Sequence, residues 1–353
     1  MSSFTPVRSV LTANLPGEWL TRHEQGHISR RTALAGIGCW LLAVSSEAEA
    51  QPQPRVRFGV LGYGTAAWEV DVMRRHALDT AHGVSIEAQR LAGAEAGKTA
   101  LLAGSVDVIV SDWVWVMRQR SEGADLVFYP YSRAVGALEL PQGSPIRTVA
   151  DLKGKRLGIA GGPLDKNWIL LRALGLRQVK RDLAEEVHPV FGAPPLLEQE
   201  FLARRLDGLL TFWNFAARLE SGGARPLLSV AQMLQGLGVS AELPMLGYVF
   251  HESWARANPI ALTRFTNATA AAKSLLASSD DEWRVLTPQL GTADPHLQAA
   301  LRDAYRAGIP RRFGKGERDG AARLFAILAE LGGEDMVGKA TSLDPGVFWA
   351  IPA

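Results

Sequence analysis

The sequence predicts an α/β protein in which two lobes, each a mostly parallel sheet flanked by helices, enclose a cleft. Short apolar runs alternate with helical stretches from Arg55 onward, which is typical of parallel sheets built from strand–helix–strand units. Two extended, aromatic-rich stretches, 126–140 and 245–251, each follow a complete set of such units. We expect these stretches to be hinge strands, where the chain crosses from one lobe to the other.

The individual elements follow from local patterns in chain order. Strands are expected at residues 56–61, 84–90, 106–110, 156–160 and 206–211, each closed by Gly, Asp or Ser. Helices are expected at 66–81, 94–103, 167–174 and 195–204, and then at 260–277, 280–287, 296–307 and 318–331. This order assigns residues 55–133 and 247–353 to lobe 1 and residues 134–246 to lobe 2.

The first fifty residues have the pattern of an export signal. Arg30 and Arg31 precede the apolar stretch 32–44, and Ala-Glu-Ala at 48–50 resembles a cleavage site. The paired arginines resemble a twin-arginine signal, and the general secretory route is the alternative. Cleavage after Ala50 would give a soluble periplasmic protein, whereas acylation of Cys39 would give a lipoprotein.

Composition excludes several classes of protein. The 353 residues carry a net charge of +2 without a basic block, which argues against a nucleic-acid partner. A hydrophobic content of 47% is too high for a disordered chain. The single cysteine cannot form an internal disulfide or a cysteine-based zinc site, and the histidines lack metal-ligand spacing. We therefore expect neither a metal, nor a cofactor, nor catalytic residues.

Two glycine motifs resemble nucleotide-binding loops. The segment 62–67 reads G-x-G-x-x-A directly after a predicted strand, which is close to a dinucleotide fingerprint. Trp68 would crowd a pyrophosphate there, so we favour a glycine turn that lets another ligand approach a helix N-terminus. The segment 93–99 is one residue too short for a P-loop. It is expected to lie on a helix with Lys98 in solvent.

Aromatic and charged residues gather where the predicted strands end. Parallel strands present their carboxyl ends to the cleft, and tryptophan offers a rigid plane for stacking, so a planar ligand is expected there. The turn 161–167 leads into a helix N-terminus, where Lys166 adds positive charge and Asp165 can cap the helix. Arg133, at the first crossing, is a second candidate partner for a ligand carboxylate.

Three segments resemble the solute-binding proteins of ABC importers, in the nitrate/taurine/sulfonate and thiamine-precursor group. They are LLAGSVDV at 101–108, DLKGKRLG at 151–158 and ARRLDG at 203–208. The resemblance implies the type II periplasmic binding fold, a small-molecule ligand, and permease and ATPase subunits as partners of a monomer. It is no evidence for one particular ligand, because these motifs report on fold.

The resemblance also implies where the ligand loops lie. By position they fall on Gly64, Thr65, Trp68, Asp112, Trp113, Gly162, Pro163, Leu164, Asp165, Trp213 and Asn214. The aromatic and charge arguments add Tyr63, Arg133 and Lys166. Sulfonate and nitrate binders of this group favour small polar residues at these loops, whereas this chain has Trp and Asp.

We therefore expect a planar organic ligand, either a pyrimidine-like precursor or a carboxylated quinone such as pyrroloquinoline quinone. The alternatives are a sulfonate or taurine binder, an enzyme on the same scaffold, and an accessory protein without a transporter.

Overall fold

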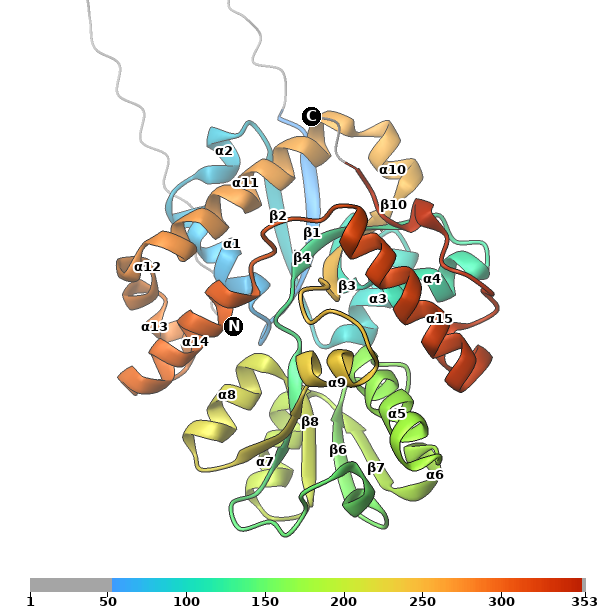
Figure 1. Cartoon of the computed structure of the whole chain (residues 1–353). Helices are drawn as coiled ribbons and strands as arrows, with labels where there is room; N and C mark the ends of the chain where they lie inside the picture. The colour runs from blue at the N-terminus through green and yellow to red at the C-terminus, as the bar shows by residue number, and fades with distance from the viewer. Residues whose placement is uncertain (1–52, 351–353) are drawn as a thin grey trace, which may run out of the picture. The chain divides into compact units, whose positions relative to one another are not determined.

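The computed structural model describes residues 53–350, which contain two five-stranded sheets (Figure 1). The expected export signal, with Cys39, lies outside the described residues. The first sheet has the order β2-β1-β3-β10-β4, with β1 at Arg55–Leu61, β2 at Ser85–Leu91, β3 at Val108–Asp112, β4 at Leu126–Ser132 and β10 at Leu246–His251. The second has the order β7-β6-β8-β5-β9, with β5 at Gly136–Leu140, β6 at Arg156–Ala160, β7 at His188–Gly192, β8 at Gly208–Phe212 and β9 at Arg225–Ser229.

Helices connect the strands and continue after the last one. Those up to β10 are α1 (Ala66–Arg75), α2 (Leu78–Ala81), α3 (Ala94–Leu102), α4 (Trp113–Ser121), α5 (Lys166–Val179), α6 (Leu183–Glu186), α7 (Pro194–Leu202), α8 (Trp213–Ser221) and α9 (Val230–Gly236). Those after it are α10 (Glu252–Ala257), α11 (Pro259–Ser278), α12 (Asp280–Val285), α13 (Thr287–Leu290), α14 (Pro295–Gly308) and α15 (Lys315–Val337). Two 3₁₀ turns lie at Val149–Leu152 and Pro345–Val347. None of the described helices has the length and hydropathy needed to cross a membrane.

In each five-stranded sheet four strands run in the same direction and one runs against its two neighbours. In the first sheet β1 pairs in parallel with β2 and β3, and β10 is antiparallel to β3 and β4. In the second sheet β6 pairs in parallel with β7 and β8, and β5 is antiparallel to β8 and β9. The strand that runs against its neighbours is β10 in the first sheet and β5 in the second. Each follows a crossing between the sheets and enters its own sheet at the end where the parallel strands have their carboxyl ends.

Several elements escape the sequence patterns for identifiable reasons. The edge strands β7 and β9 carry Pro189 and Pro226, and proline weakens a strand pattern although edge strands tolerate it. The expected helix 66–81 is interrupted at Ala77, whose φ of 49° is left-handed. The helix α4 begins immediately where β3 ends, at Trp113, so no turn residues separate the two patterns.

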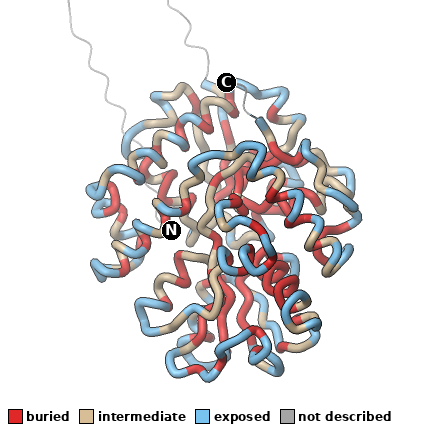
Figure 2. The backbone as a smooth tube through the Cα atoms, in the orientation of Figure 1, coloured by how far each residue is buried: buried red, intermediate tan, exposed pale blue. Residues whose placement is uncertain are grey.

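The C-terminal helix α15 joins the cores of the two sheets (Figure 2). Its Leu324, Phe325 and Leu328 belong to one buried cluster that also holds Leu170 and Leu171 of α5 and residues of α4. Each buried leucine or phenylalanine contributes roughly 1.5 to 3 kcal/mol relative to exposure. The two sheets are therefore tied together by apolar packing along one side, in addition to the crossing strands.

Glu139 of β5 is a carboxyl group buried inside the second sheet. Its side chain has no exposed surface, and neither of its oxygens has a hydrogen-bond partner among the described residues. Burial, reinforced by the nearby carboxyl of Glu220, raises the pKa of Glu139 to about 8. The folded protein therefore favours the protonated acid.

This carboxyl predicts a loss of stability at alkaline pH. An unfolded glutamate has a pKa near 4.5, so the stability that Glu139 contributes is fully present below that value and is lost as the pH rises towards about 8. The loss should not exceed about 5 kcal/mol. Urea unfolding of Glu139→Gln between pH 5 and 8.5 should show a flatter profile than the wild type. The exposed Glu330→Gln serves as control, and equal profiles for wild type and Glu139→Gln would contradict the assignment.

Candidate functional site

A pocket of about 110 Å³ lies where the parallel strands of the two sheets end. It is lined by residues of β1, β3, β10, α1 and α3 on one side and by residues around the starts of α5 and α8 on the other. The lining comprises Gly59, Val60, Leu61, Gly64, Thr65, Ala66, Leu91, Ala94, Gly97, Lys98, Ile109, Val110, Ser111, Asp112, Asp165, Lys166, Phe212, Trp213, Asn214 and Leu246. We call this space the cleft pocket. At about 30 Å³ per water it has room for about four water molecules, so it suits a ligand of a few non-hydrogen atoms.

The N-termini of five helices meet at the cleft pocket. The first turns of α4 and α5 are capped by carboxylates, since Asp112 accepts a hydrogen bond from Trp115 N (2.8 Å) and Asp165 from Asn167 N (2.9 Å). The starts of α1, α3 and α8 carry no side-chain cap. The positive ends of their dipoles favour a bound anion there. Some of the first backbone N–H groups are already engaged, since Trp213 N of α8 donates to Val135 O (3.1 Å) and Trp68 N of α1 to Thr65 O (3.1 Å).

Four charged side chains are buried around this pocket. Lys98 Nζ pairs with Glu95 at 2.9 Å, and Lys166 Nζ lies 3.6 Å from Asp165. Burial raises the pKa of Asp112 above its ordinary value, an effect that the charges of Lys166 and Lys98 partly oppose. When Asp112 is protonated, the lining carries two lysines against Asp165, and Glu95 outside the lining pairs with Lys98. Within residues 53–350, no group of three or more His, Cys, Asp or Glu side chains could hold a metal ion.

The two sides of the pocket touch each other directly. Asn214 Nδ2, at the start of α8, donates a hydrogen bond to the backbone oxygen of Tyr63 across the cleft (3.3 Å). The rings of Trp68 and Trp213 meet edge to face with centroids 5.8 Å apart. These contacts join the two sides in the present conformation and account for the small volume between them.

A second hollow of about 560 Å³ adjoins the cleft pocket at Val60 and Asn214. Tyr63 and Trp68, both expected ligand residues, line this hollow and not the cleft pocket. Seven of the fourteen expected residues line the cleft pocket: Gly64, Thr65, Asp112, Asp165, Lys166, Trp213 and Asn214.

Apart from Tyr63, Trp68 and Arg133, four expected ligand residues do not line the cleft pocket: Trp113, Gly162, Pro163 and Leu164, of which Leu164 is exposed. Trp113 has no exposed surface and packs edge to face on Phe348 in the core. Gly162 is half-buried beside the Glu95 side chain, and Pro163 is exposed. Among the described residues, Trp213 is the tryptophan that lines the cleft pocket, and Trp68 lines the adjoining hollow.

Arg133 occupies the first crossing but is engaged by the protein itself. Its guanidinium forms an ion pair with Glu242 and donates to the backbone oxygen of Ala307 (2.5 Å), while its backbone N donates to Gly308 O (2.8 Å). It does not line the cleft pocket. Arg133 therefore joins the first crossing to the segment before the second crossing and to the end of α14.

Lys98 is the pocket residue that the sequence analysis placed wrongly. It was expected to be solvated, yet it is 8% exposed and lines the cleft pocket together with Ala94 and Gly97. Residues 94, 97 and 98 share one face of a helix because of their i, i+3, i+4 spacing. The small residues Ala94 and Gly97, on the same helix face as Lys98, were the sequence feature that could have indicated that this face lies against the pocket.

Comparisons with known proteins identify the family to which this chain belongs. The family model described as NMT1/THI5 like matches residues 80–282. A protein of Escherichia coli (strain K12) that is named for binding aliphatic sulfonates is 30% identical over 133 residues. That alignment covers 36% of this chain and 40% of the relative, so it spans less than half of either protein.

Solved structures share the fold over most of the chain. The alkanesulfonate-binding protein SsuA from Xanthomonas axonopodis pv. citri, bound to MOPS, has a TM-score of 0.63 at 20% identity and covers 80% of this chain and 96% of its own. The periplasmic aliphatic sulphonate-binding protein SsuA from Escherichia coli has a TM-score of 0.62 at 18% identity and covers 82% and 94%. The expected type II periplasmic binding fold is thereby confirmed.

The position of Trp213 predicts that it reports ligand binding. In a fluorescence titration of the wild type with alkanesulfonates, pyrimidines and carboxylated quinones, the class that binds should change tryptophan emission. Trp213→Phe should lose most of that change, because the other described tryptophans lie outside the cleft pocket. The control Trp254→Phe changes a tryptophan of α10 outside the cleft pocket and should keep the change in emission. An undiminished change in Trp213→Phe would place the ligand elsewhere.

Proposed function

Since this chain belongs to the NMT1/THI5-like family, we propose that it is the solute-binding protein of an ABC importer and captures a small sulfonate-type organic anion in the cleft pocket. The observation that carries the proposal is the joint presence of two buried lysines and three uncapped helix N-termini around a small cavity. A sulfonate spreads one negative charge over three oxygens, and several converging donors suit such a group.

The pocket supports the sulfonate alternative better than a large planar ligand. A volume of about 110 Å³ is small for a carboxylated quinone, and only Phe212 and Trp213 contribute aromatic rings. Similarity to sulfonate-binding proteins favours the same choice. Phe212 and Leu246 offer apolar surface for a short organic group beyond the anion.

Each polar residue of the cleft pocket has a role in this proposal. Lys98 and Lys166 approach from opposite sides and supply full positive charges. The Ala66 N–H at the start of α1 and the Thr65 hydroxyl would meet the anion on one side, and the Asn214 amide would meet it on the other. A ligand that contacts both sides binds the closed arrangement more tightly than an open one, which is the condition for ligand-driven closure.

The remaining parts of the proposal concern location and partners. The relatives include periplasmic binding proteins, which supports an exported, periplasmic protein without favouring the twin-arginine route. They are solute-binding proteins and not enzymes, so a binding role without catalysis is proposed here. A permease and an ATPase would receive the ligand from the closed monomer.

Removing the positive charge of Lys166 tests the proposal. Calorimetry with ethanesulfonate should show that Lys166→Met binds about 10- to 150-fold more weakly, because a hydrogen bond to a charged group contributes roughly 1.5 to 3 kcal/mol. Lys153→Met removes an equal charge from an exposed side chain and should bind like the wild type. Equal affinity of Lys166→Met and wild type, with both folded by circular dichroism, would sink the sulfonate proposal.

The buried Asp112 predicts how binding depends on pH. Because burial raises the pKa of Asp112, the acid keeps its proton to a higher pH than usual, and its ionised form would repel an anion. Affinity for ethanesulfonate should therefore fall as the pH rises through that pKa. Asp112→Asn keeps a group that can cap α4 and should show a flatter profile between pH 4.5 and 8. Parallel profiles would show that another group causes the pH dependence.

A further inference from the structure

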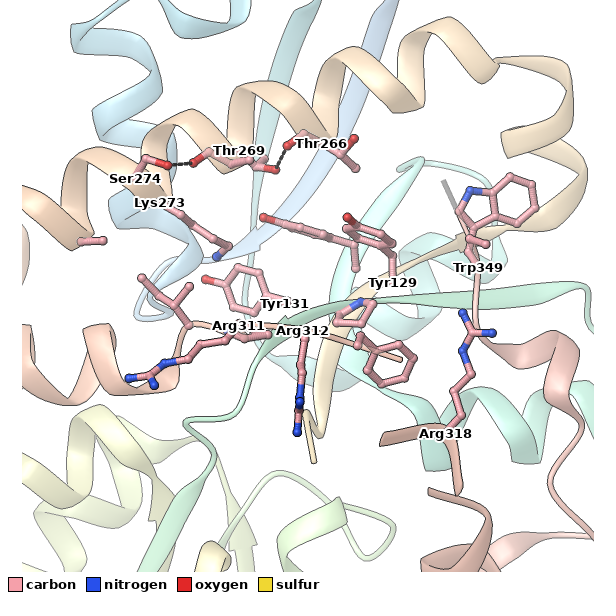
Figure 3. A pocket seen from close by; sticks show the side chains of 18 residues that line it. Tyr129, Tyr131, Thr266, Thr269, Lys273, Ser274, Arg311, Arg312, Arg318 and Trp349 are labelled. Carbon is pink, nitrogen blue, oxygen red and sulfur yellow. Dashed lines mark hydrogen bonds between the residues drawn. The ribbon is translucent and has the colours of Figure 1, made fainter. Parts of the chain in front are cut away.

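A cavity of about 600 Å³ lies in the first lobe, outside the cleft pocket, between α11, β4 and the segment that follows α14 (Figure 3). This volume falls within the range of small-molecule sites, about 300 to 1,000 Å³, and is several times that of the cleft pocket. None of its lining residues lines the cleft pocket. We call it the lobe 1 cavity.

The lining of the lobe 1 cavity combines aromatic rings with positive charge. Tyr129, Tyr131, Tyr248, Phe313 and Trp349 supply the rings, and Lys273, Arg311, Arg312 and Arg318 supply the charge. The lining contains no aspartate or glutamate. Figure 3 shows Lys273 on one side of the tyrosine rings, with Trp349 and Arg318 on the other.

Two of these cations are not neutralised by the protein. Arg311 and Arg318 form no ion pair with any described carboxylate, and Arg318 lies over the Phe313 ring, 5.9 Å from its centroid. Arg312, in contrast, pairs with Glu317 at 3.2 Å. A guanidinium that rests on an aromatic face still presents its N–H groups at the edge of its plane, where a carboxylate or sulfonate can bind.

Lys273 is held at the other end of the cavity by a buried network. Its Nζ pairs with Glu69 at 2.5 Å and lies 3.6 Å from the centroid of the Tyr131 ring. Glu69 also accepts hydrogen bonds from the hydroxyls of Tyr305 (2.6 Å) and Tyr248 (3.2 Å). Lys273 and Tyr248 are therefore held in place before any ligand arrives, so this end of the cavity needs no ordering on binding.

We propose that the lobe 1 cavity is a second ligand site, which binds an aromatic organic anion. The ring system would lie against Tyr129, and its carboxylate or sulfonate would meet Arg318 at the edge of the cavity. This chemistry differs from that of the cleft pocket, where the volume suits only a small anion. The site also adjoins the first crossing, because Ile309 and Pro310 of its lining directly follow Gly308, whose oxygen accepts a hydrogen bond from Arg133 N.

The experiment uses 2-naphthoate as the probe and 2-naphthamide as its uncharged match. Calorimetry on the full mature chain should show saturable one-to-one binding of 2-naphthoate and weaker binding of 2-naphthamide. Arg318→Gln should weaken 2-naphthoate by about tenfold and 2-naphthamide little, as expected for one charge-assisted contact. Arg323→Gln makes the same charge change on α15 outside the cavity and should bind like the wild type.

Two further variants locate the binding. Tyr129→Ala should weaken both probes, because it removes ring contact, whereas Lys166→Met in the cleft pocket should leave 2-naphthoate unaffected. Absence of 2-naphthoate binding at millimolar concentration would overturn the lobe 1 site. Binding that survives Arg318→Gln and Tyr129→Ala but is lost in Lys166→Met would also overturn it, and would leave the anion proposal for the cleft pocket intact.

Discussion

The direction of two strands determines where the cleft pocket lies. The crossing strands β5 and β10 each enter their sheet at the end where the parallel strands have their carboxyl ends. Each therefore runs antiparallel to both of its neighbours. This arrangement brings the carboxyl ends of β1, β3, β6 and β8 towards one another. The helices that follow those strands must then begin at the same place, and their positive ends meet there.

The helix N-termini around the cleft pocket favour anions, and the neighbouring side chains change the charge there. Asp112 and Asp165 cap α4 and α5, which removes two of the five helix starts from ligand binding. Lys98 and Lys166 restore positive charge from opposite sides of the cleft pocket. The lysines are buried at some cost in desolvation, and neighbouring carboxylates and aromatic faces lower that cost.

Many aromatic residues in the described part of the chain pack against one another. Trp68 meets Trp213, Trp283 and Tyr305, so one indole connects the cleft to the helical end of the chain. On the other side, α15 packs on both α4 and α5 and ties the two sheets together. The two sheets are thus joined by apolar packing through α15 and, across the cleft pocket, by the hydrogen bond from Asn214 to Tyr63 O.

The sequence by itself determined the fold class, the order of most elements and the two crossings, because hydrophobic period and turn residues are local properties of the chain. It also located loops such as Gly64–Thr65, Asp165–Lys166 and Trp213–Asn214 at strand ends. Only the tertiary structure decided which side chains of those loops face the pocket. A tryptophan after a strand can turn towards ligand or core, and Trp113 turned inward because Phe348, more than two hundred residues away, completes its packing. Lys98 faces the pocket for the same kind of reason, since the elements that bury it are remote in sequence.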